Sequence, residues 1–440
     1  MPARKRDFGY DGAMTHCDPA AARKFAIQVV RRLREEGYQA FWAGGCVRDH
    51  LLGVVPHDYD VATGARPDEI RALFGKRRTL ALGAAFGVIT VLGRKVEGQV
   101  EVATFRSDHG YSDGRHPDQV TFSSPEEDAK RRDFTINGMF YDPLEDRVID
   151  YVGGEEDLRQ RRIRAIGDPA ARFAEDQLRL LRAIRFTAGL AADLDPETAA
   201  AVTRWAPRID AVSGERIAEE MRRMLVHPTR ARAADLLRQC GLLDAILPES
   251  RPPEEPLERW AQILRLLEVL QRPSFSVALA ALLWEPQQVE LAGDFVATLS
   301  RRWRLSNAES VTVLWVLQNA GLILQGSTAR WPQLQRVLIH PQIQELMVFA
   351  RGLAGSCPEL QAAIAYSQEA LAQEPGHLNP PPLISGADLT DLGIPPGPIY
   401  SHLLTSARDA QLENQVHDRE SALQLVEKIW RNKSAIRSVS

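Results

Sequence analysis

The stretch Gly44–Asp60, GGCVRDHLLGVVPHDYD, decides the fold of the first part of this chain. It opens with two adjacent glycines and closes with two aspartates, Asp58 and Asp60, that are one residue apart. The apolar run AFWA precedes it, so the order predicts a strand, a glycine turn, the short helix CVRDHLL and a second strand that begins near Asp58. Because successive side chains of a strand alternate between its faces, Asp58 and Asp60 should share a face, with Tyr59 on the other.

Two parallel carboxylates beside a glycine turn and a helix N-terminus form a suitable site for Mg²⁺ and a nucleoside triphosphate. An isolated pair with this spacing is more often a solvated acidic turn. The interpretation therefore depends on the residues that follow.

The composition describes an ordinary globular protein. The chain has 440 residues, 44% hydrophobic and 25% charged, which is enough for about two to four domains. Its basic N-terminal segment has no apolar region after it, and no apolar run approaches the ~18 residues of a membrane span. We therefore expect a cytoplasmic location without a membrane. A net charge of −4 excludes a uniformly basic surface but permits a segregated basic face for a nucleic acid.

The four cysteines show neither CxxC nor Cys/His metal spacing, so they are interpreted as reduced thiols. Cys46 directly follows the glycine pair. Its position suits a small packing residue better than a nucleophile.

The residues around the glycine turn predict a small α+β head. Helices are expected over residues 20–37 and 65–75, and the runs GVITVLG and GQVEVATF predict an antiparallel hairpin. Glu101 lies on the second hairpin strand, on the face opposite Val100 and Val102. It could be a third member of the acidic cluster, although an exposed strand glutamate explains the alternation equally well.

Residues 106–119 are polar and rich in Gly and Asp, which predicts a long mobile loop. A helix is expected to begin at Ser124, followed by Arg131, Arg132 and the predicted strand FTINGMFYD. One of the two arginines should point into the head, where its planar fork would suit triphosphate oxygens. A solvated basic turn explains the pair equally well.

From about Ile149 the sequence is expected to be helical to its end. The segment EDQLRLLRAIRF places Asp176, Arg179, Arg182 and Arg185 three residues apart, which makes Asp176 and Arg179 neighbours on one helix face. For an isolated helix the simpler interpretation is a surface ion pair. The proline-rich residues 374–386 predict a joint, after which two helices flank a tight turn; this pair could touch a nucleic-acid backbone or cap the body.

Five motifs follow one another between about Phe41 and about Leu190: GGCVRD, HDYDVAT, EVATFR, RRDFTIN and EDQLRLLRAIRF. In this order and spacing they resemble the bacterial tRNA nucleotidyltransferase (CCA-adding) and poly(A) polymerase family, class II of the polymerase-beta-like superfamily. Each motif alone is weak, but five in sequence are specific.

The resemblance implies an α+β fold, with a small mixed-sheet nucleotidyltransferase head followed by an all-helical neck, body and tail. The implied boundaries are a flexible N-terminal tail at 1–18, the catalytic head at 19–148, the neck with the nucleotide-selecting helix at 149–205, the body at 206–373 and an RNA-binding tail at 374–440.

The resemblance also implies roles for thirteen residues. The triphosphate would contact Gly44, Gly45 and Arg48, with Arg132 bracing the phosphates and Asp133 and Asn137 near the ribose. Asp58 and Asp60 would hold Mg²⁺, and Glu101 would help to activate the RNA 3′-hydroxyl. Asp176 and Arg179 would read the base, and Arg182 and Arg185 would support either these two residues or the phosphates.

Cytosine and adenine both present an amino donor beside a ring-nitrogen acceptor. Asp176 can accept from the amino group while Arg179 donates to the ring nitrogen. Uracil and guanine invert this order, and the resulting mismatch of buried polar groups would discriminate against them by about 10² or more.

The implied reaction is template-independent addition of C and A to the tRNA 3′ end, by attack of the 3′-hydroxyl on the α-phosphorus of CTP or ATP with release of pyrophosphate. Poly(A) polymerase and A-only addition remain alternatives within the family. The segment GAAFG lacks the basic run that marks bacterial poly(A) polymerases, and the compact loop at 106–119 favours CCA or terminal A addition. Gly64 and Gly138 depart from the family pattern at positions outside the proposed chemistry.

Candidates from other classes are a small-molecule nucleotidyltransferase, a metal-dependent phosphohydrolase and a non-enzymatic RNA-binding module. The first should lack the reading helix and the long helical body. The second would need partner histidines, and the third would not need paired carboxylates, which repel phosphate. The expected partners are thus tRNA, CTP and ATP, with no stable protein partner predicted.

Overall fold

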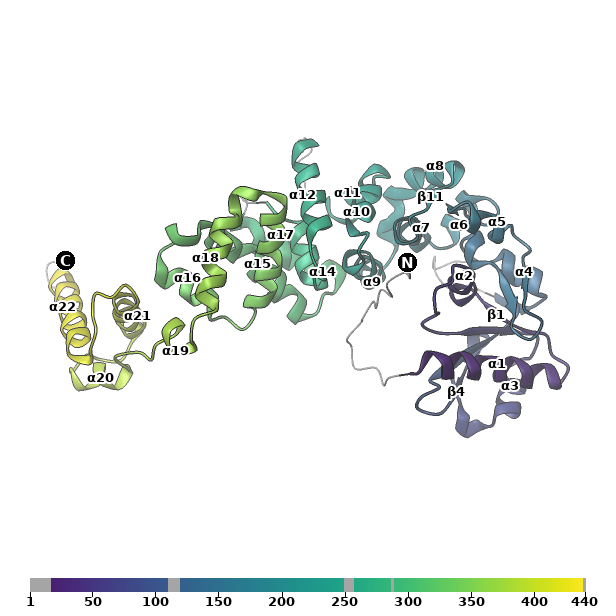
Figure 1. Ribbon diagram of the computed structural model, residues 1–440, viewed down its shortest axis with the longest axis horizontal. Coiled ribbons are helices and arrows are strands. Elements are labelled where there is room, and N and C mark those ends of the chain that lie inside the picture. The colour runs from purple at the N-terminus through teal and green to yellow at the C-terminus, as the bar shows by residue number, and fades with distance from the viewer. Residues whose placement is uncertain (1–16, 110–118, 249–256, 286–288, 438–440) are drawn as a thin grey trace, which may run out of the picture. The chain divides into compact units, whose positions relative to one another are not determined.

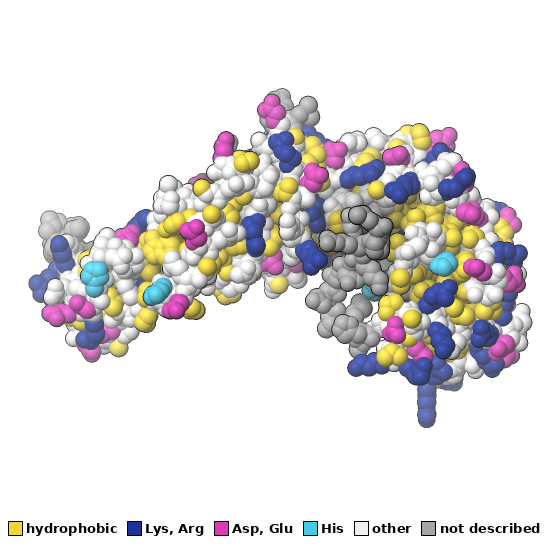
Figure 2. Space-filling model, viewed as in Figure 1, with side chains coloured by type: hydrophobic (Ala, Val, Ile, Leu, Met, Phe, Trp, Pro, Cys, Tyr) yellow, Lys and Arg dark blue, Asp and Glu magenta, His cyan; other side chains and the backbone are white. Residues whose placement is uncertain are grey.

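The computed structural model describes residues 17–109, 119–248, 257–285 and 289–437. The chain divides into two compact units, the first comprising Met1–Met224 and Arg232–Pro248 and the second Leu225–Ala231 and Glu249–Ser440. None of the described helices is both long and apolar enough to cross a membrane. On the face shown in Figure 2, lysine and arginine side chains lie among acidic ones.

The first unit begins with a seven-stranded mixed sheet in the order β3-β4-β5-β2-β1-β8-β9. Only the neighbours β2 and β5 run parallel; the other pairs are antiparallel. Helices α1 and α3 pack against its strands (Figure 1). The bounds are α1 Pro19–Glu35, β1 Ala40–Ala43, α2 Gly45–Leu51, β2 Asp60–Thr63, α3 Pro67–Phe74, β3 Thr79–Gly83, β4 Val88–Leu92, β5 Gln99–Thr104, α4 Pro125–Lys130, β8 Phe140–Asp142 and β9 Arg147–Ile149.

The alternation predicted for the central strands is confirmed. Val100 and Val102 of β5 are buried, whereas Glu101 between them is exposed. Tyr59 is buried and packs against Trp42 of β1, with ring centroids 4.7 Å apart. Burial of Val100 and Val102 fixes which face of β5 is turned to the core, so Glu101 is left on the other face.

Two local predictions for the head were wrong. FTINGMFYD is not one strand: residues Thr135–Asn137 form a 3-10 turn, and β8 begins only at Phe140. The side chain of Asp133 accepts hydrogen bonds from the Phe134 N–H and from the Asn137 amide, which closes the turn. The expected loop at 106–119 contains paired strands, β6 Arg106–His109 and β7 Gln119–Phe122; residues 110–118 lie outside the described residues.

The two departures from the family pattern differ in their packing. A Cβ at Gly138 would stand 2.7 Å from Val152 and 2.9 Å from Ile166, so the packing around this turn requires glycine. A Cβ at Gly64 would meet nothing within 4 Å, and nothing in the structure explains glycine there.

The chain from residue 149 is mainly helical, but it is interrupted by two short strands that the periodicity did not predict. Residues 159–167, RQRRIRAIG, do not form a helix, because α5 ends at Arg159 and β10 then pairs in parallel with β11. Elements of this part are α5 Gly154–Arg159, β10 Arg162–Ile163, α6 Pro169–Glu175, α7 Leu178–Gly189, β11 Asp193–Leu194, α8 Pro196–Trp205, the 3-10 turn Ala206–Ala211, α9 Gly214–Val226, α10 Arg230–Gln239 and α11 Leu242–Ile246.

The second unit is helical throughout its described part. Helix α13 is buried along its whole length and packs on α12, α15 and α17. The helices are α12 Leu257–Val269, α13 Phe275–Leu282, α14 Ala292–Trp303, α15 Asn307–Gln325, α16 Trp331–Leu338, α17 Ile343–Ser356, α18 Gln361–Leu371, α19 Pro375–Leu378, α20 Gly386–Asp391, α21 Pro398–Leu412 and α22 Arg419–Arg437.

The expected turn between the last helices is present at Gly393, which has a φ of +72°. Leu389, Leu403 and Val426 form a small separate core of α20, α21 and α22. The three helices therefore stabilise one another through their own apolar faces.

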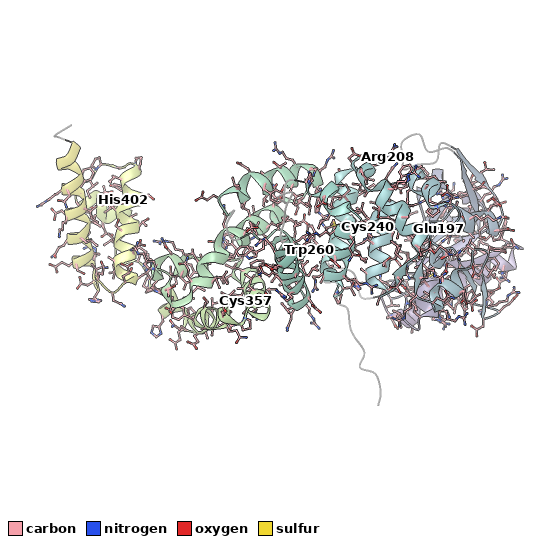
Figure 3. All side chains as sticks on the ribbon, turned by 90° about the horizontal axis from the view of Figure 1, so that it is seen from above. Glu197, Arg208, Cys240, Trp260, Cys357 and His402 are labelled. Atoms are coloured by element: carbon pink, nitrogen blue, oxygen red, sulfur yellow. The ribbon has the colours of Figure 1, made fainter. Side chains whose placement is uncertain are left out.

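The four cysteines are free thiols, as predicted. Cys240 follows α10 and Cys357 follows α17 (Figure 3). Cys46 is buried, donates a hydrogen bond to the Ala43 carbonyl at 3.3 Å, and burial raises the pKa of its thiol to about 12. A thiol that stays protonated is a packing residue and not a nucleophile.

Candidate active site

Two of the three predicted carboxylates lie on neighbouring strands, and the third lies in the bend just before one of them. Strands β2 and β5 pair in parallel with Asp60 opposite Glu101, and Asp58 precedes Asp60 by two residues. Both aspartates are exposed on the face opposite the buried Tyr59. The tertiary pairing thus removes the ambiguity that alternation left for Glu101: it adjoins the acidic pair.

The electrostatics of this cluster are unbalanced. Desolvation by the surrounding protein, followed by the negative charges of Asp58 and Glu101, raises the pKa of Asp60 to about 7, and Arg132 only partly offsets these effects. An unbalanced group of carboxylate oxygens fits a hard divalent cation. Among the described residues, no three His, Cys, Asp or Glu side chains form a complete metal site. The remaining ligands would then come from substrate phosphates or water, as is usual for Mg²⁺.

This raised pKa predicts how the stability of the metal-free protein depends on pH. The unfolded carboxyl titrates near ~3.9, so between that value and about 7 the folded state binds the proton more tightly. Wild-type stability should therefore fall as pH rises through this window. Asp60→Asn should remove this contribution, so its advantage in melting temperature over the wild type should grow from about pH 5 to about pH 7 and then level off.

Thermal unfolding of both proteins in a chelator, at several pH values, measures this difference. Asp210→Asn, at an exposed aspartate of the turn Ala206–Ala211, is the matched control and should show a constant difference. An Asp60→Asn difference that does not change with pH would contradict the assignment.

The glycine turn brings two arginines close to its backbone. Gly44 caps α2 with φ +73°, and a Cβ there would stand 3.1 Å from Nη1 of Arg132. A Cβ at Gly45 would stand 3.7 Å from Nη2 of Arg48. Gly44 is therefore needed both for its positive φ and for the approach of Arg132. The expectation that one arginine of the pair points into the head is met by Arg132.

Arg132 is held by a buried carboxylate that the sequence did not single out. Asp128 accepts from Nη2 of Arg132 at 3.0 Å and from Nη2 of Arg131 at 2.8 Å. Burial alone would raise the pKa of Asp128, but the two arginines lower it overall. Asp128 lies on α4 and Arg132 follows its end, and their i,i+4 spacing is the only feature of the sequence that could have predicted this pair.

A chain of contacts runs from the glycine turn to α7. Nη1 of Arg48 donates to Oδ1 of Asn137 at 2.8 Å, and Nδ2 of Asn137 donates to Oδ1 of Asp133 at 3.1 Å. Oδ2 of Asp133 then accepts from Nε and Nη2 of Arg182 at 2.8 and 2.5 Å. Both oxygens of Asp133 are engaged, so it acts on the site through Asn137 and Arg182.

Asp133 is buried, and its ion-pair partner Arg182 has a side chain that is 31% exposed. Burial alone would raise the pKa of Asp133, but Arg182, the Asn137 amide and the Phe134 N–H lower it to about 2. The stabilisation from this ionised carboxylate is present above its unfolded pKa and is lost as pH falls through about 2.

Replacing Asp133 with asparagine should destabilise the first unit substantially. The change removes the charge that pairs with the partly exposed Arg182 guanidinium, and losing charge-assisted hydrogen bonds of this kind costs roughly 1.5–3 kcal/mol. Urea unfolding measures the loss in the free energy of unfolding. Glu156→Gln, which breaks the exposed Arg159 pair, is the matched control and should cost less than ~1 kcal/mol. Equal effects of the two changes would contradict the assignment.

The predicted base readers do not pair with each other. Asp176 ends α6 with extended dihedrals, and α7 begins only at Leu178, so Asp176 is not on the helix that carries Arg179. Asp176 instead binds Arg216 of α9 through both oxygens, at 3.1 and 2.8 Å. Arg179 donates from Nη1 to Glu175 at 2.6 Å and to the Arg172 carbonyl at 3.0 Å. The break at Asp176 frees both side chains for separate partners.

Asp176 and Arg179 each keep hydrogen-bonding groups that no described residue uses. A carboxylate has about four acceptor positions, and Asp176 uses three of them, two with Arg216 and one with the Leu178 N–H. Within the described residues, Arg179 makes its side-chain contacts through Nη1 alone, which leaves the N–H groups on Nε and Nη2. Their side chains are 16% and 11% exposed, so a base that bound them would be partly shielded from water.

The last two predicted residues surround Phe186. Arg182 and Arg185 lie over its ring with guanidinium carbons 5.3 and 4.3 Å from the centroid, and Arg48 is 5.3 Å away. Nε of Arg185 donates to Glu220 of α9 at 2.6 Å. Arg185 is therefore held beside Phe186 by Glu220. Arg216 and Glu220 were missed because their motif, ERIAEEM, looks like an ordinary surface helix.

Two family models match separate parts of the chain. The model described as Poly A polymerase head domain matches residues 40–164, and the model described as Probable RNA and SrmB-binding site of polymerase A matches residues 193–252. The CCA-adding enzyme of Lactobacillus johnsonii is 34% identical, covering 90% of this chain and 95% of the relative. That of Enterococcus faecalis is 32% identical, covering 93% and 97%.

Solved structures give the same picture. The crystal structure of the Bacillus stearothermophilus CCA-adding enzyme in complex with CTP has a TM-score of 0.69 and 28% identity, covering 94% of this chain and 98% of that one. The Thermotoga maritima CCA-adding enzyme complexed with tRNA_CCA has a TM-score of 0.64 at 20% identity, covering 92% and 95%, and supports the fold alone.

Proposed function

This chain belongs to the family of CCA-adding enzymes, and we propose that it adds C and A to tRNA 3′ ends with the head and neck residues described above. The substrates are CTP, ATP and a tRNA acceptor end, and pyrophosphate is the second product. We propose the cytoplasm as its location, because its RNA and nucleotide substrates occur there.

One observation carries the assignment of the site. The contacts Arg48–Asn137–Asp133–Arg182 connect the glycine turn to α7, which also carries Arg179. A nucleoside triphosphate whose phosphates bind at the glycine turn would therefore have its base directed toward α7 and Arg179. Separate surface features would not need this buried connection.

The carboxylates have distinct proposed tasks. Asp58 and Asp60 would hold Mg²⁺, which when bound lowers the pKa of the RNA 3′-hydroxyl and neutralises charge on the triphosphate. Glu101, opposite Asp60 in the register, would orient the attacking hydroxyl and accept its proton. Arg132, held by Asp128, would bind phosphate oxygens beside Gly44.

Base selection would depend on the fixed positions of Asp176 and Arg179. The free acceptor position of Asp176 suits the amino group of cytosine or adenine, and the free N–H groups of Arg179 suit the adjacent ring nitrogen. Uracil would place a carbonyl against the carboxylate, and guanine would do the same. Two protein side chains could thus select C and A without a nucleic-acid template.

Three RNAs test this function against its alternatives within the family: a tRNA transcript that ends before CCA, one that ends at CC, and an unrelated RNA. Each is incubated with CTP and ATP, separately and together. We expect CCA on the first and a single A on the second. Long A tails on all three would favour a poly(A) polymerase, and A added only to the CC end would favour an A-adding enzyme.

A further inference from the structure

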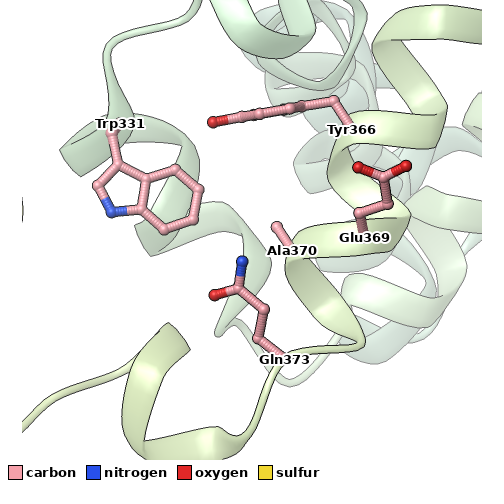
Figure 4. A pocket seen from close by; sticks show the side chains of 5 residues that line it. All are labelled: Trp331, Tyr366, Glu369, Ala370 and Gln373. Atoms are coloured by element: carbon pink, nitrogen blue, oxygen red, sulfur yellow. The ribbon is translucent and has the colours of Figure 1, made fainter.

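A cavity of about 250 Å³ lies between α16 and α18 of the second unit, and none of the residues discussed so far lines it. Trp331 at the start of α16 forms one side, and Tyr366, Glu369 and Ala370 of α18 with the following Gln373 form the rest. Figure 4 shows the indole and phenol on different sides of the opening, with the Gln373 amide directed between them. The cavity is open and is smaller than the ~300–1,000 Å³ of sites for drug-sized ligands.

The polar groups of this cavity have no protein partner among the described residues. This holds for the Trp331 indole N–H, the Tyr366 hydroxyl, the Glu369 carboxylate and the Gln373 amide. Trp331 and Tyr366 are half-buried, while Glu369 and Gln373 are exposed. By contrast, Arg330, which precedes Trp331, pairs at 2.7 Å with Glu413, which follows α21. Two aromatic side chains and four kinds of hydrogen-bonding group therefore line one small space, and the described part of the fold does not use these groups as hydrogen-bond partners.

The chemistry of the lining selects a ligand class. Aromatic side chains stack on nucleobases, which is how proteins hold unpaired RNA bases. Glu369 can only accept hydrogen bonds when ionised, so it suits an exocyclic amino group, and the Gln373 amide can both donate and accept. The lining contains a carboxylate but no Lys, Arg or His, which does not suit a phosphate.

We propose that this cavity binds one unpaired adenine or cytosine presented by the tRNA substrate, because Glu369 can accept from the amino group while the Gln373 amide donates to the ring nitrogen beside it. This inference rests on the proposed function, because that function supplies an RNA with unpaired bases. The absence of a cation in the lining favours a base whose phosphates remain outside, on the RNA backbone, over a free nucleotide. The contact would add to tRNA affinity without touching the reaction.

Dimethyl sulfate probing of tRNA tests the proposal directly, because the reagent methylates the base edges that the cavity would cover on adenine and cytosine. In the complex with wild-type protein, one unpaired A or C should be protected. With Trp331→Ala that protection should disappear while protection elsewhere persists. An identical pattern with both proteins would overturn the proposal.

Affinity measurements provide the matching quantitative test. Loss of one stacked base is worth ~1–3 kcal/mol, so Trp331→Ala should raise the Kd for tRNA roughly 5- to 150-fold. Trp331→Phe, which keeps an aromatic face, should recover most of the affinity. Glu369→Gln should weaken binding about tenfold. Glu359→Gln removes the same charge at an exposed position outside the cavity and should not change the Kd for tRNA. Equal effects of the two glutamate changes would mean that only the overall charge matters, and would overturn the proposal.

Three further measurements separate the possible outcomes. Melting temperatures show whether Trp331→Ala is folded, and the conservative variants keep the test valid if it is not. Equilibrium dialysis with ATP and CTP shows whether the cavity binds a free nucleotide. If Trp331→Ala loses nucleotide binding but leaves the protection of tRNA unchanged, the proposal that the base belongs to tRNA is overturned. The turnover rate at saturating tRNA should be the same in all folded variants, because the cavity does not take part in the reaction. If the wild-type protein binds tRNA with the expected protection but does not add CCA, the proposed function is refuted while the proposed base-binding cavity stands.

Discussion

Asp58→Ala is expected to abolish nucleotide addition while leaving the protein folded. Asp58 and Asp60 are the proposed cation ligands, and losing one should lower kcat at least ~10³-fold, equivalent to about 4 kcal/mol in the barrier. The fold should not suffer, because Asp58 is exposed and its charge raises the pKa of Asp60. Removing it therefore relieves repulsion. Single-turnover addition of CTP to a tRNA lacking CCA measures the rate, and thermal unfolding measures the stability.

Two comparisons make this result specific. Asp244→Ala, at an exposed aspartate of α11 in the same unit, should retain full activity. Glu101→Gln should show an intermediate loss, because its carboxylate would assist the attacking hydroxyl and the two aspartates would still be present. Turnover that survives in a folded Asp58→Ala protein would refute the assignment of the metal and catalytic residues.

Asp176→Ala is expected to damage nucleotide choice as well as rate. The change removes the acceptor for the amino group of cytosine and adenine, so kcat/KM for both CTP and ATP should fall about 10²-fold, while misincorporation of UTP relative to CTP should rise. Incorporation of each of the four nucleotides at the first position, measured separately, gives the discrimination ratio. Asp193→Ala, at an aspartate that is 94% exposed, is the control and should keep that ratio.

Arg216→Lys gives the same site a finer test. Lysine keeps the positive charge beside Asp176 but cannot reproduce the two-pronged contact at 3.1 and 2.8 Å. We expect discrimination to fall more than the rate with CTP, because Asp176 remains present but is less well fixed. Unchanged discrimination in Arg216→Lys would mean that Arg216 only supports the fold.

Much of the head could be predicted from the amino-acid sequence. Alternation of polar and apolar residues predicted strands β4 and β5 and placed Glu101 opposite Val100 and Val102, and the glycine pair predicted the turn before α2. These features are local: each depends on residues within about ten positions of one another, so spacing alone contains them. The proposed domain boundaries and site roles remain predictions.

Other local features were beyond the reach of periodicity. The segment from Phe134 has the composition of a strand, but the Asp133 carboxylate accepts hydrogen bonds from the Phe134 N–H and the Asn137 amide, and a 3-10 turn forms instead. Likewise, EDQLRLLRAIRF has uninterrupted helical spacing, yet the backbone breaks at Asp176. In both cases a side chain competes with regular backbone pairing, and residue spacing does not report that competition.

The sequence by itself determined the order of the elements, the acidic pair, the glycine turn and the set of residues that resemble the family. Only the tertiary structure decided which of these residues meet: Glu101 beside Asp60, Arg132 beside Gly44, Asp133 with Arg182, and Asp176 with Arg216. The physical reason is separation along the chain. Pairs that lie 40 or more residues apart are brought together by strand pairing and helix packing, which depend on the whole core and leave no fixed spacing in the sequence.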